Sequence, residues 1–280
     1  MKRYKPTTKS RRQMSAVSYR DYLSGDKPQK SLVHGRKRHV GRNSAGRITV
    51  RHKGSGHKRR FRTVDFSYNK IGVPARVASV EYDPNRSGFI ALASYADGEK
   101  RYHLVPQEVK VGQTFSTKED APLFPGSRLP LRKIPAGTSV HNIEMHPGGG
   151  AKLVRSAGSF AVVLGHDAGF AQIKMPSTEV RKINENSWAS VGAVSNPEHN
   201  LVNYGKAGAS RYRGIRPTVR GTAMNPVDHP HGGGEGRQGR GLRRAKTMWG
   251  KPSGKGQKTR RPKKYSNVHI VTRRRVGKNK

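Results

Sequence analysis

The middle of the chain carries the hydrophobic pattern of short β-strands. Residues 77–82 alternate with a period of two, which puts Ala78, Val80 and Tyr82 on one face of a predicted strand. Turn-forming residues follow at 83–88, where proline fixes φ and glycine can take a positive φ. The same reading along the chain predicts strands at 77–82, 89–95, 100–105, 109–115, 138–145, 151–155, 159–164, 170–175 and 179–183.

The predicted strands fall into two groups. A stretch with four prolines separates them, because proline interrupts a strand; these are Pro122, Pro125, Pro130 and Pro135. No segment keeps a helical period over ten or more residues. We therefore predict a mainly β protein with two small antiparallel barrels or sandwiches, at 63–125 and 126–200. Small barrels of this kind, including the OB type, commonly bind nucleic acid.

Charge is concentrated at the two ends of the chain. Residues 1–62 hold 20 Lys or Arg and two acids, and residues 201–280 hold 22 and two, whereas the centre holds 15 and 13. Two cationic extensions on a nearly neutral core predict a polyanionic partner. Alone, the extensions bury too little apolar surface to offset their ordering entropy, so we expect them to be largely disordered without that partner.

Composition excludes several other classes. The chain has no cysteine, which rules out a disulfide framework and thiolate zinc sites and fits a reducing interior. It has no apolar run near 18 residues, and no hydrophobic stretch follows the basic start, so we expect no membrane span, no secretory signal and a cytoplasmic location. An organellar transit peptide is disfavoured because 19–27 is neither acid-free nor convincingly amphipathic. The extensions also lack the Leu- and Phe-rich face of a membrane-surface helix, which favours nucleic acid over a membrane.

The extensions have features suited to RNA. Residues 41–62 alternate glycine, histidine and basic residues around a short strand-like run at 48–50, and glycine lets the backbone approach phosphates closely. Aromatic rings on which bases could stack are spaced along the other extension at Tyr204, Tyr212, Trp249 and Tyr265.

The segment 225–237 contains several side chains that could take part in catalysis or bind a metal. It places both acids of the C-terminal extension beside two histidines. His229 could act as a general base oriented by Asp228, since imidazole titrates near neutral pH. Alternatively, Asp228, His229, His231 and Glu235 could bind a metal, or the segment could be a proline- and glycine-shaped loop packed against RNA. We favour the packed loop, because no cysteine and no further ligand-orienting partner is evident.

Two arginines lie in turns of the near-neutral centre. Arg86 belongs to the 83–88 turn, and Arg155 ends a predicted strand. Each is either a bidentate contact to phosphate or guanine, or an ordinary solvated arginine. Nucleotide-binding loops are not supported, because 250–259 lacks the phosphate-loop spacing and Gly54-Ser55-Gly56 lacks the third glycine of a dinucleotide motif.

Several segments together resemble one known family. They are 4–8, 41–43, 46–52, 54–59, 144–150, 179–183 and, most specifically, 220–237, whose sequence is RGTAMNPVDHPHGGGEGR. From near its first residue to its last, the chain resembles the family of the second protein of the large ribosomal subunit, bacterial type. One stretch departs from the pattern: the family usually has His-Pro-x-x-Pro before Trp-Gly, and this chain has RRAKTM at 243–248.

The resemblance implies an OB-fold barrel followed by an SH3-like barrel, with extensions threading into the large-subunit rRNA. It implies a primary RNA-binding role in assembly, a contact with small-subunit rRNA, neighbouring ribosomal proteins and, indirectly, tRNA. A contested suggestion gives the histidine matching His229 a part in peptide-bond formation. The positions matching Arg86 and Arg155 are implicated in RNA binding.

Combining residues and resemblance, we expect a structural ribosomal protein that is not an enzyme and needs no metal or cofactor apart from RNA-associated magnesium. The rival classes are an enzyme centred on His229 and a nucleoid-type DNA binder. The expected RNA contacts are Arg51, His52, His57, Lys58, Arg59, Arg86, Arg155, Arg220, Asn225, His229, His231, Arg237, Arg240, Trp249, Lys258 and Arg260.

Overall fold

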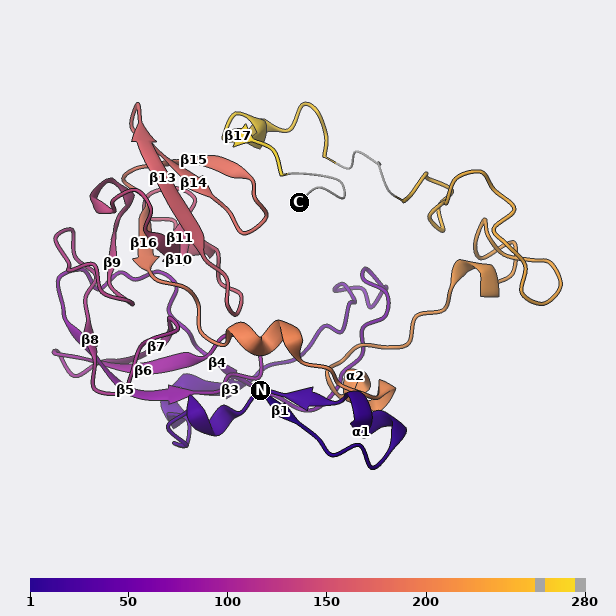
Figure 1. Ribbon diagram of the computed structural model, residues 1–280, viewed down its shortest axis with the longest axis horizontal. Coiled ribbons are helices and arrows are strands. Elements are labelled where there is room, and N and C mark those ends of the chain that lie inside the picture. Colours follow the sequence, from indigo (N-terminus) through magenta and orange to yellow (C-terminus); the bar gives the residue numbers. More distant parts are fainter. Residues whose placement is uncertain (255–259, 275–280) are drawn as a thin grey trace. The chain divides into compact units, whose positions relative to one another are not determined.

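The computed structural model describes residues 1–254 and 260–274 and is mainly β (Figure 1), which confirms the predicted fold class. The longest helix among these residues has six residues. Contacts divide the chain into two compact units. The first contains residues 1–37 and 58–205 together with the last strand, and the second contains 38–57 and 206–267.

The OB-like half of the first unit is a four-stranded antiparallel sheet in the order β7-β6-β5-β8. The segment 82–89 connects β5 to β6, and a short turn at 96–99 connects β6 to β7, where Gly98 takes a φ of 85°, as the Asp-Gly pair requires. The strands are β5 (Ala75–Glu81), β6 (Ile90–Tyr95), β7 (Lys100–Leu104) and β8 (Thr114–Phe115). The last is much shorter than the predicted strand at 109–115.

A β-bulge changes which side chains of β5 face inward. The register shifts between Val77 and Ser79 where β5 pairs with β6. Val77 is buried, Ala78 is exposed, and Val80 and Glu81 are both buried in succession. The regular alternation predicted for 77–82 therefore fails, because a bulge adds one residue and moves later side chains to the other face.

The SH3-like half is a curled seven-stranded sheet in the order β17-β15-β14-β13-β10-β16-β9. A two-residue turn joins β13 to β14, with Ala168 at φ 47° and Gly169 at φ 78°, the conformation that matches strand twist. The strands are β9 (Arg128–Pro130), β10 (Ser139–His141), β13 (Ala161–Asp167), β14 (Phe170–Lys174), β15 (Val180–Asn184), β16 (Trp188–Val191) and β17 (Ile270–Thr272).

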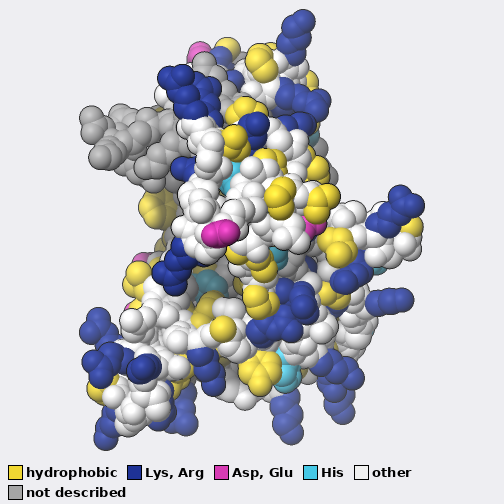
Figure 2. Space-filling view, turned by 90° about the vertical axis from the view of Figure 1, so that its right-hand side faces the viewer, with side chains coloured by type: hydrophobic (Ala, Val, Ile, Leu, Met, Phe, Trp, Pro, Cys, Tyr) yellow, Lys and Arg dark blue, Asp and Glu magenta, His cyan; other side chains and the backbone are white. Residues whose placement is uncertain are grey.

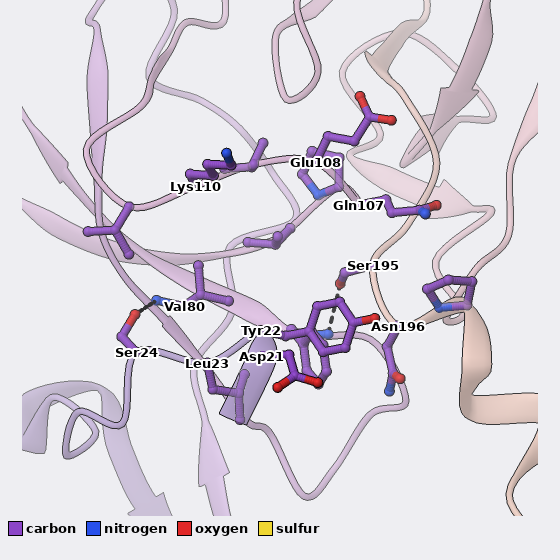
Figure 3. A pocket seen from close by; sticks show the side chains of 16 residues that line it. Asp21, Tyr22, Leu23, Ser24, Val80, Gln107, Glu108, Lys110, Ser195 and Asn196 are labelled. Carbon is purple, nitrogen blue, oxygen red and sulfur yellow. Dashed lines mark hydrogen bonds between the residues drawn. The ribbon is translucent and has the colours of Figure 1, made fainter. Parts of the chain in front are cut away.

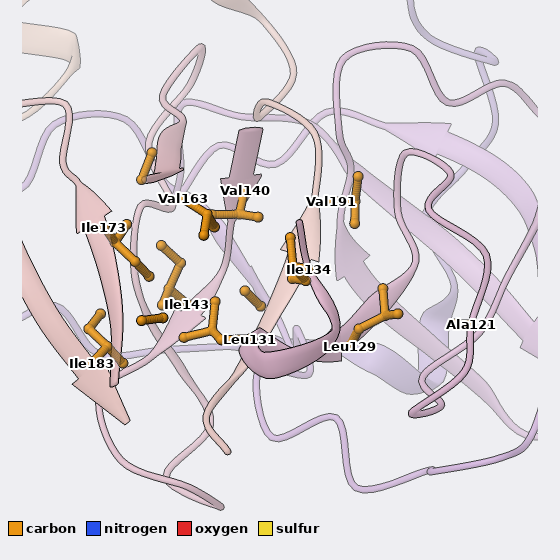
Figure 4. Packing of buried hydrophobic residues seen from close by; sticks show 13 residues of the cluster. Ala121, Leu129, Leu131, Ile134, Val140, Ile143, Val163, Ile173, Ile183 and Val191 are labelled. Carbon is orange, nitrogen blue, oxygen red and sulfur yellow. The ribbon is translucent and has the colours of Figure 1, made fainter. Parts of the chain in front are cut away.

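Buried aliphatic residues fill the inside of this curled sheet. Side chains from β9, β10, β14 and β16 converge there, together with Leu131 and Ile134 of the short segment after β9 (Figure 4). Leu131, Val140 and Ile173 have no exposed surface. Burying such side chains contributes roughly 1.5–3 kcal/mol each, so this cluster is the main source of stability in this half.

Smaller elements complete the fold. Two-stranded sheets are formed by β1 (Lys2–Arg3) with β2 (Ser15–Ala16), β3 (Val33–Gly35) with β4 (Arg60–Arg62), and β11 (Ile143–Glu144) with β12 (Ala151–Leu153). The helices are α1 (Lys9–Gln13) and α2 (Ala207–Tyr212), with 3-10 turns η1 (Tyr19–Asp21), η2 (Lys30–Leu32), η3 (Leu131–Lys133), η4 (Pro197–Leu201), η5 (Gly221–Ala223) and η6 (Tyr265–Asn267).

The second unit joins part of one basic extension to part of the other. Gly54 N–H donates to the carbonyl of Gly214, and His57 N–H donates to that of Tyr212, at 2.8 Å each. A Cβ on Gly56 would lie 2.6 Å from the Gly214 nitrogen and the Tyr212 oxygen. These glycines therefore let two backbones meet. The domain boundaries expected at 62/63, 125/126 and 200/201 stay predictions.

Candidate nucleic-acid interface

Arg86 and Arg155 lie against the same aromatic ring. The guanidinium carbon of Arg86 is 5.3 Å from the centroid of Phe66, and that of Arg155 is 4.5 Å from it. Cation–π attraction of this kind holds each arginine by about 0.5–2 kcal/mol. Two cations from turns about 70 residues apart in sequence are thus gathered in one place. The sequence indicated both arginines but gave no signal that Phe66 joins them.

A buried carboxylate fixes Arg86. Its Nε donates to Asp83 Oδ2 at 2.6 Å, and Asp83 has no exposed surface. The other oxygen of Asp83 accepts from the backbone and side chain of Asn85. Because the anchor uses Nε, the two terminal nitrogens of Arg86 keep the fork geometry that suits a phosphate.

Arg155 is placed by an unusual backbone. Val154 has a φ of 53°, a left-handed value that is strained for a β-branched residue. Its carbonyl accepts from Asn142 N–H at 3.0 Å, and Arg155 Nη1 donates to the carbonyl of Ala151 at 3.3 Å. The chain therefore turns sharply just before Arg155 and leaves its side chain exposed beside Phe66.

Basic residues of β4 and the segment before it reach the same turn. Arg59 Nη1 donates to the carbonyl of Pro84 at 3.0 Å, and Asn85 Nδ2 donates to that of Arg60 at 2.8 Å. The predicted contacts Lys58 and Arg59 therefore belong to the same unit as Arg86 and Arg155. Together they form a cationic surface that we call the Phe66 site, defined as Arg59, Phe66, Arg86 and Arg155.

The other predicted contacts that the structure describes lie in the second unit, where two histidines shape a loop. His229 Nδ1 accepts from the backbone N–H of His231 at 3.0 Å, and His231 Nε2 accepts from that of Lys246 at 2.9 Å. The His229 ring also packs on Gly221, where an added Cβ would lie 2.5 Å from it. A nitrogen that accepts a hydrogen bond carries no proton, so His229 in neutral form presents its proton at Nε2.

These contacts support the packed-loop interpretation of 225–237. Nδ1 of His229 accepts from the His231 backbone N–H, so Asp228, the orienting group of the general-base alternative, cannot accept a hydrogen bond from that nitrogen. Partial desolvation and the neighbouring His229 lower the pKa of His231. Within 1–254 and 260–274, no three His, Cys, Asp or Glu side chains lie close enough together to hold a metal ion.

The remaining predicted residues differ in their surroundings. Trp249 is 76% exposed and able to stack on a base. Arg260 instead forms hydrogen bonds with nearby residues of its own segment, because its Nε donates to Asn267 and its Nη2 to Ser266. Arg51 contacts Met248, and His52 lies 3.1 Å from the Pro217 carbonyl. Arg220, Asn225, Arg237 and Arg240 are exposed, and Lys258 lies outside the described residues.

Positive charge dominates the molecular surface. Figure 2 shows many Lys and Arg side chains on the visible face, with apolar and other side chains between them and few acids, as expected from 57 basic and 17 acidic residues. Such a surface attracts a polyanion at long range. Among the described residues, no helix combines the length and hydrophobicity that crossing a bilayer would require.

Comparison with known families decides the assignment. Residues 29–117 match the family model described as Ribosomal Proteins L2, RNA binding N-terminal domain. Residues 124–250 match Ribosomal Proteins L2, C-terminal domain. The chain belongs to the ribosomal L2 family. It is therefore a structural, RNA-binding protein of the large ribosomal subunit. The first match includes Arg86 and Phe66, and the second includes Arg155 and the His229 loop, whereas Arg260 lies beyond both.

Proposed function

We propose that this L2 protein is a primary binder of large-subunit rRNA and that the Phe66 site is its specific contact. The observation that supports this is the convergence of Arg86 and Arg155 on one ring, each with its guanidinium restrained. Restrained arginines lose less side-chain entropy on binding and can contact phosphate or guanine bidentately. The basic residues of both extensions add affinity that depends on salt and little on sequence.

The same proposal assigns the protein wider roles in the ribosome. Binding of rRNA by both units would help the large subunit to assemble and would hold neighbouring ribosomal proteins. It would also support association with small-subunit rRNA, tRNA binding and the architecture of the peptidyl transferase region. The protein would work in the cytoplasmic ribosome without a cofactor of its own, apart from magnesium held by the RNA. It would perform no chemical step, which the hydrogen-bonded His229 loop supports.

The test compares Arg86→Gln and Arg155→Gln with Arg132→Gln. Arg132 is an exposed arginine of the same unit whose partner is the exposed carboxylate of Glu119, so it is a matched control. Losing one charge-assisted contact should weaken binding to a cognate large-subunit rRNA fragment roughly 10- to 100-fold. Arg132→Gln should change it little. Quantitative filter binding against cognate and random RNA gives both affinities.

Discrimination is the deciding quantity. Arg86→Gln and Arg155→Gln should each lose the preference for cognate over random RNA. The slope of log affinity against log salt concentration should fall only by the amount expected for about one lost phosphate contact. If either variant keeps the full preference, the arginine it replaces is an ordinary surface charge and the Phe66 site is not the specific contact.

A further inference from the structure

The glycine-rich segment 144–150 contacts the Phe66 site through its backbone. Ala151 N–H, directly after this segment, donates to the Phe66 carbonyl at 2.7 Å. A Cβ built on Gly150 would lie 2.8 Å from that carbonyl oxygen, whereas one built on Gly148 would have nothing within 4 Å. The missing side chain at position 150 therefore lets the two backbones approach this closely.

Ala151 links the aromatic ring to one of the two cations beside it. Its N–H holds the backbone of Phe66, and its carbonyl accepts from Arg155 Nη1 at 3.3 Å. Phe66 itself belongs to the OB-like half, because Asp65 N–H donates to the Tyr102 carbonyl of β7 at 2.8 Å. The contact at position 150 therefore carries Arg155 from β12 to a ring of the OB-like half.

A second contact joins the two turns that carry the arginines. Ala157 lies two residues after Arg155, and its N–H donates at 3.1 Å to the Oγ of Ser87, the residue after Arg86. The relative position of the two arginines is thus fixed at two points, at the Phe66 backbone and at the Ser87 hydroxyl.

Further hydrogen bonds make this junction rigid. Phe89 N–H donates to Ser195 Oγ at 3.0 Å, at the wall of a cavity in the first unit (Figure 3). The neighbouring Asn196 donates from its Nδ2 to the Ser87 carbonyl at 2.7 Å. The Ser87 turn is therefore held by a segment before β13 and by another after β16.

We propose that Gly150 and Ser87 are positioning residues for RNA recognition. They hold Arg86 and Arg155 as one pair that binds neighbouring phosphates of a single RNA fold. Both guanidinium carbons lie within 5.3 Å of the Phe66 centroid, so they are at most about 10 Å apart. Keeping two like charges this close costs free energy, which bound phosphates recover. Gly150 is buried and acts only through its neighbours. The inference rests on the function proposed for the two arginines.

The test compares Gly150→Ala with Gly148→Ala in the full chain. The two glycines have φ values of 70° and 72°, so alanine strains the backbone similarly at both, and only Gly150→Ala also displaces Phe66. In filter binding, Gly150→Ala should lower the preference for cognate over random RNA roughly tenfold. Gly148→Ala should keep it. A merely structural role would instead weaken the binding of both RNAs together.

Ser87 supplies a second variant, which decides the matter even if Gly150→Ala folds poorly. Ser87→Ala removes the acceptor of the Ala157 N–H and should also lower the preference, by roughly three- to tenfold. Ser87→Thr keeps a hydroxyl and should restore it. A preference that is unchanged in folded Gly150→Ala or in Ser87→Ala overturns the proposal, as does a threonine variant no better than the alanine one.

A double-mutant comparison separates this proposal from the proposed function. Arg155→Gln should cost less than about threefold in cognate affinity in the Gly150→Ala background, because Arg155 is already displaced there. The same replacement should cost roughly 10- to 100-fold in the native chain. Equal costs in both backgrounds overturn the positioning role and leave the proposed function standing. If Arg86→Gln and Arg155→Gln keep the full preference in the native chain, the proposed function itself fails.

Discussion

At the scale of single residues, two buried histidines make the fold sensitive to acid. Burial lowers the pKa of both His103 and His141 to about 4. Nδ1 of His141 donates to the Gly192 carbonyl at 2.9 Å, and Nε2 of His103 lies 2.8 Å from the Tyr95 hydroxyl. Neutral rings therefore satisfy these bonds, and a charged ring would have to be desolvated.

The unfolded chain should bind these protons first. Histidine in an unfolded chain titrates near 6.5, so between about pH 6.5 and 4 the unfolded state takes up protons that the folded state does not. The free energy of unfolding should fall across that window by roughly 3 kcal/mol per histidine, and the histidine contribution should level off below it. Urea unfolding, followed by Trp188 fluorescence in a Trp249→Phe background, measures this.

The histidines can be tested one at a time. Replacing either His103 or His141 by Gln should remove about half of the pH dependence between 6.5 and 4. Replacing the exposed His146 by Gln should leave it unchanged. A stability that stays level across the window would show that neither buried ring controls it.

Residue-level prediction from the sequence works where a side chain's surroundings are local. The sequence placed Arg86 in its turn and the two histidines in their loop from neighbouring residues, and their RNA contacts stay predictions. Phe66 was missed, because its importance comes from two arginines distant in the chain. The inward face of β5 was not predictable either, since the bulge that sets it depends on pairing with β6.

At the scale of elements, a buried ion pair ties β9 to β11. Arg128 Nη2 donates to Glu144 Oε1 at 2.9 Å, and the two side chains are 1% and 4% exposed. Arg128 also donates to the Asn142 carbonyl at 2.7 Å and lies over the ring of Tyr68 at 4.3 Å. The two strands belong to different sheets, so this pair holds the two sheets together at this point.

Breaking this pair should be costly. Arg128→Met leaves the Glu144 carboxylate buried without its partner, and unfolding free energy should fall by about 3–5 kcal/mol. Adding Glu144→Gln should recover a large part. Arg132→Met, which breaks the exposed pair with Glu119, should cost no more than about 1 kcal/mol. Chemical denaturation compares them; equal losses from the buried and exposed pairs would contradict the argument.

A second element-scale prediction concerns the contact between the two extensions. Gly56 and Gly46 both have positive φ, 61° and 76°, so alanine strains the backbone at either position. Only at Gly56 would the new Cβ meet backbone atoms, at 2.6 Å, whereas at Gly46 nothing lies within 4 Å. Gly56→Ala should therefore cost roughly 1–3 kcal/mol more than Gly46→Ala.

Amide hydrogen exchange gives the local measurement. The N–H groups of Gly54 and His57, which donate across this contact, should exchange faster in Gly56→Ala than in Gly46→Ala. Equal protection in the two variants would mean that close approach does not depend on the missing side chain.

Sequence patterns predicted elements unevenly. Strands bounded by clear turns, such as β6 and β14, were placed within a residue or so. The paired strands β9 and β16 were missed, because β9 ends in proline and carries the buried Arg128, so neither strand shows an apolar alternation. The run at 48–50 forms only an isolated bridge between Ile48 and Arg42. Instead of a strand ladder, Thr49 N–H and Val50 N–H both donate to the Gly41 carbonyl, at 2.8 and 3.0 Å.

At the scale of the whole molecule, charge distribution correctly indicated a nucleic-acid partner, and the resemblance correctly indicated the family. What the sequence could not show is that 52–57 pairs with 212–217, more than 150 residues away. The sequence of each extension, taken alone, predicts only a solvent-exposed series of charged residues. Together they bring backbone donors and acceptors into register, and the close approach of the two backbones explains the glycines at 54 and 56.

The same loop structure predicts how the assembled ribosome responds to loss of His229. A general base typically supplies a factor of about 10²–10⁴ in rate. Because Nδ1 of His229 accepts from the His231 backbone and its ring packs on Gly221, we expect His229→Ala to loosen the loop instead. Subunit assembly or tRNA positioning should suffer. Fully assembled particles should form peptide bonds at close to the normal single-turnover rate.

Pre-steady-state kinetics on purified, fully assembled His229→Ala ribosomes measure that rate directly. His146→Ala, which replaces an exposed histidine outside the loop, is the matched control and should leave both assembly and rate unchanged. His229→Gln separates ring chemistry from packing, because glutamine can still accept from the His231 N–H but cannot act as the base. It should restore assembly. A chemical step a hundredfold slower in both His229 variants, with tRNA binding intact, would establish a catalytic role.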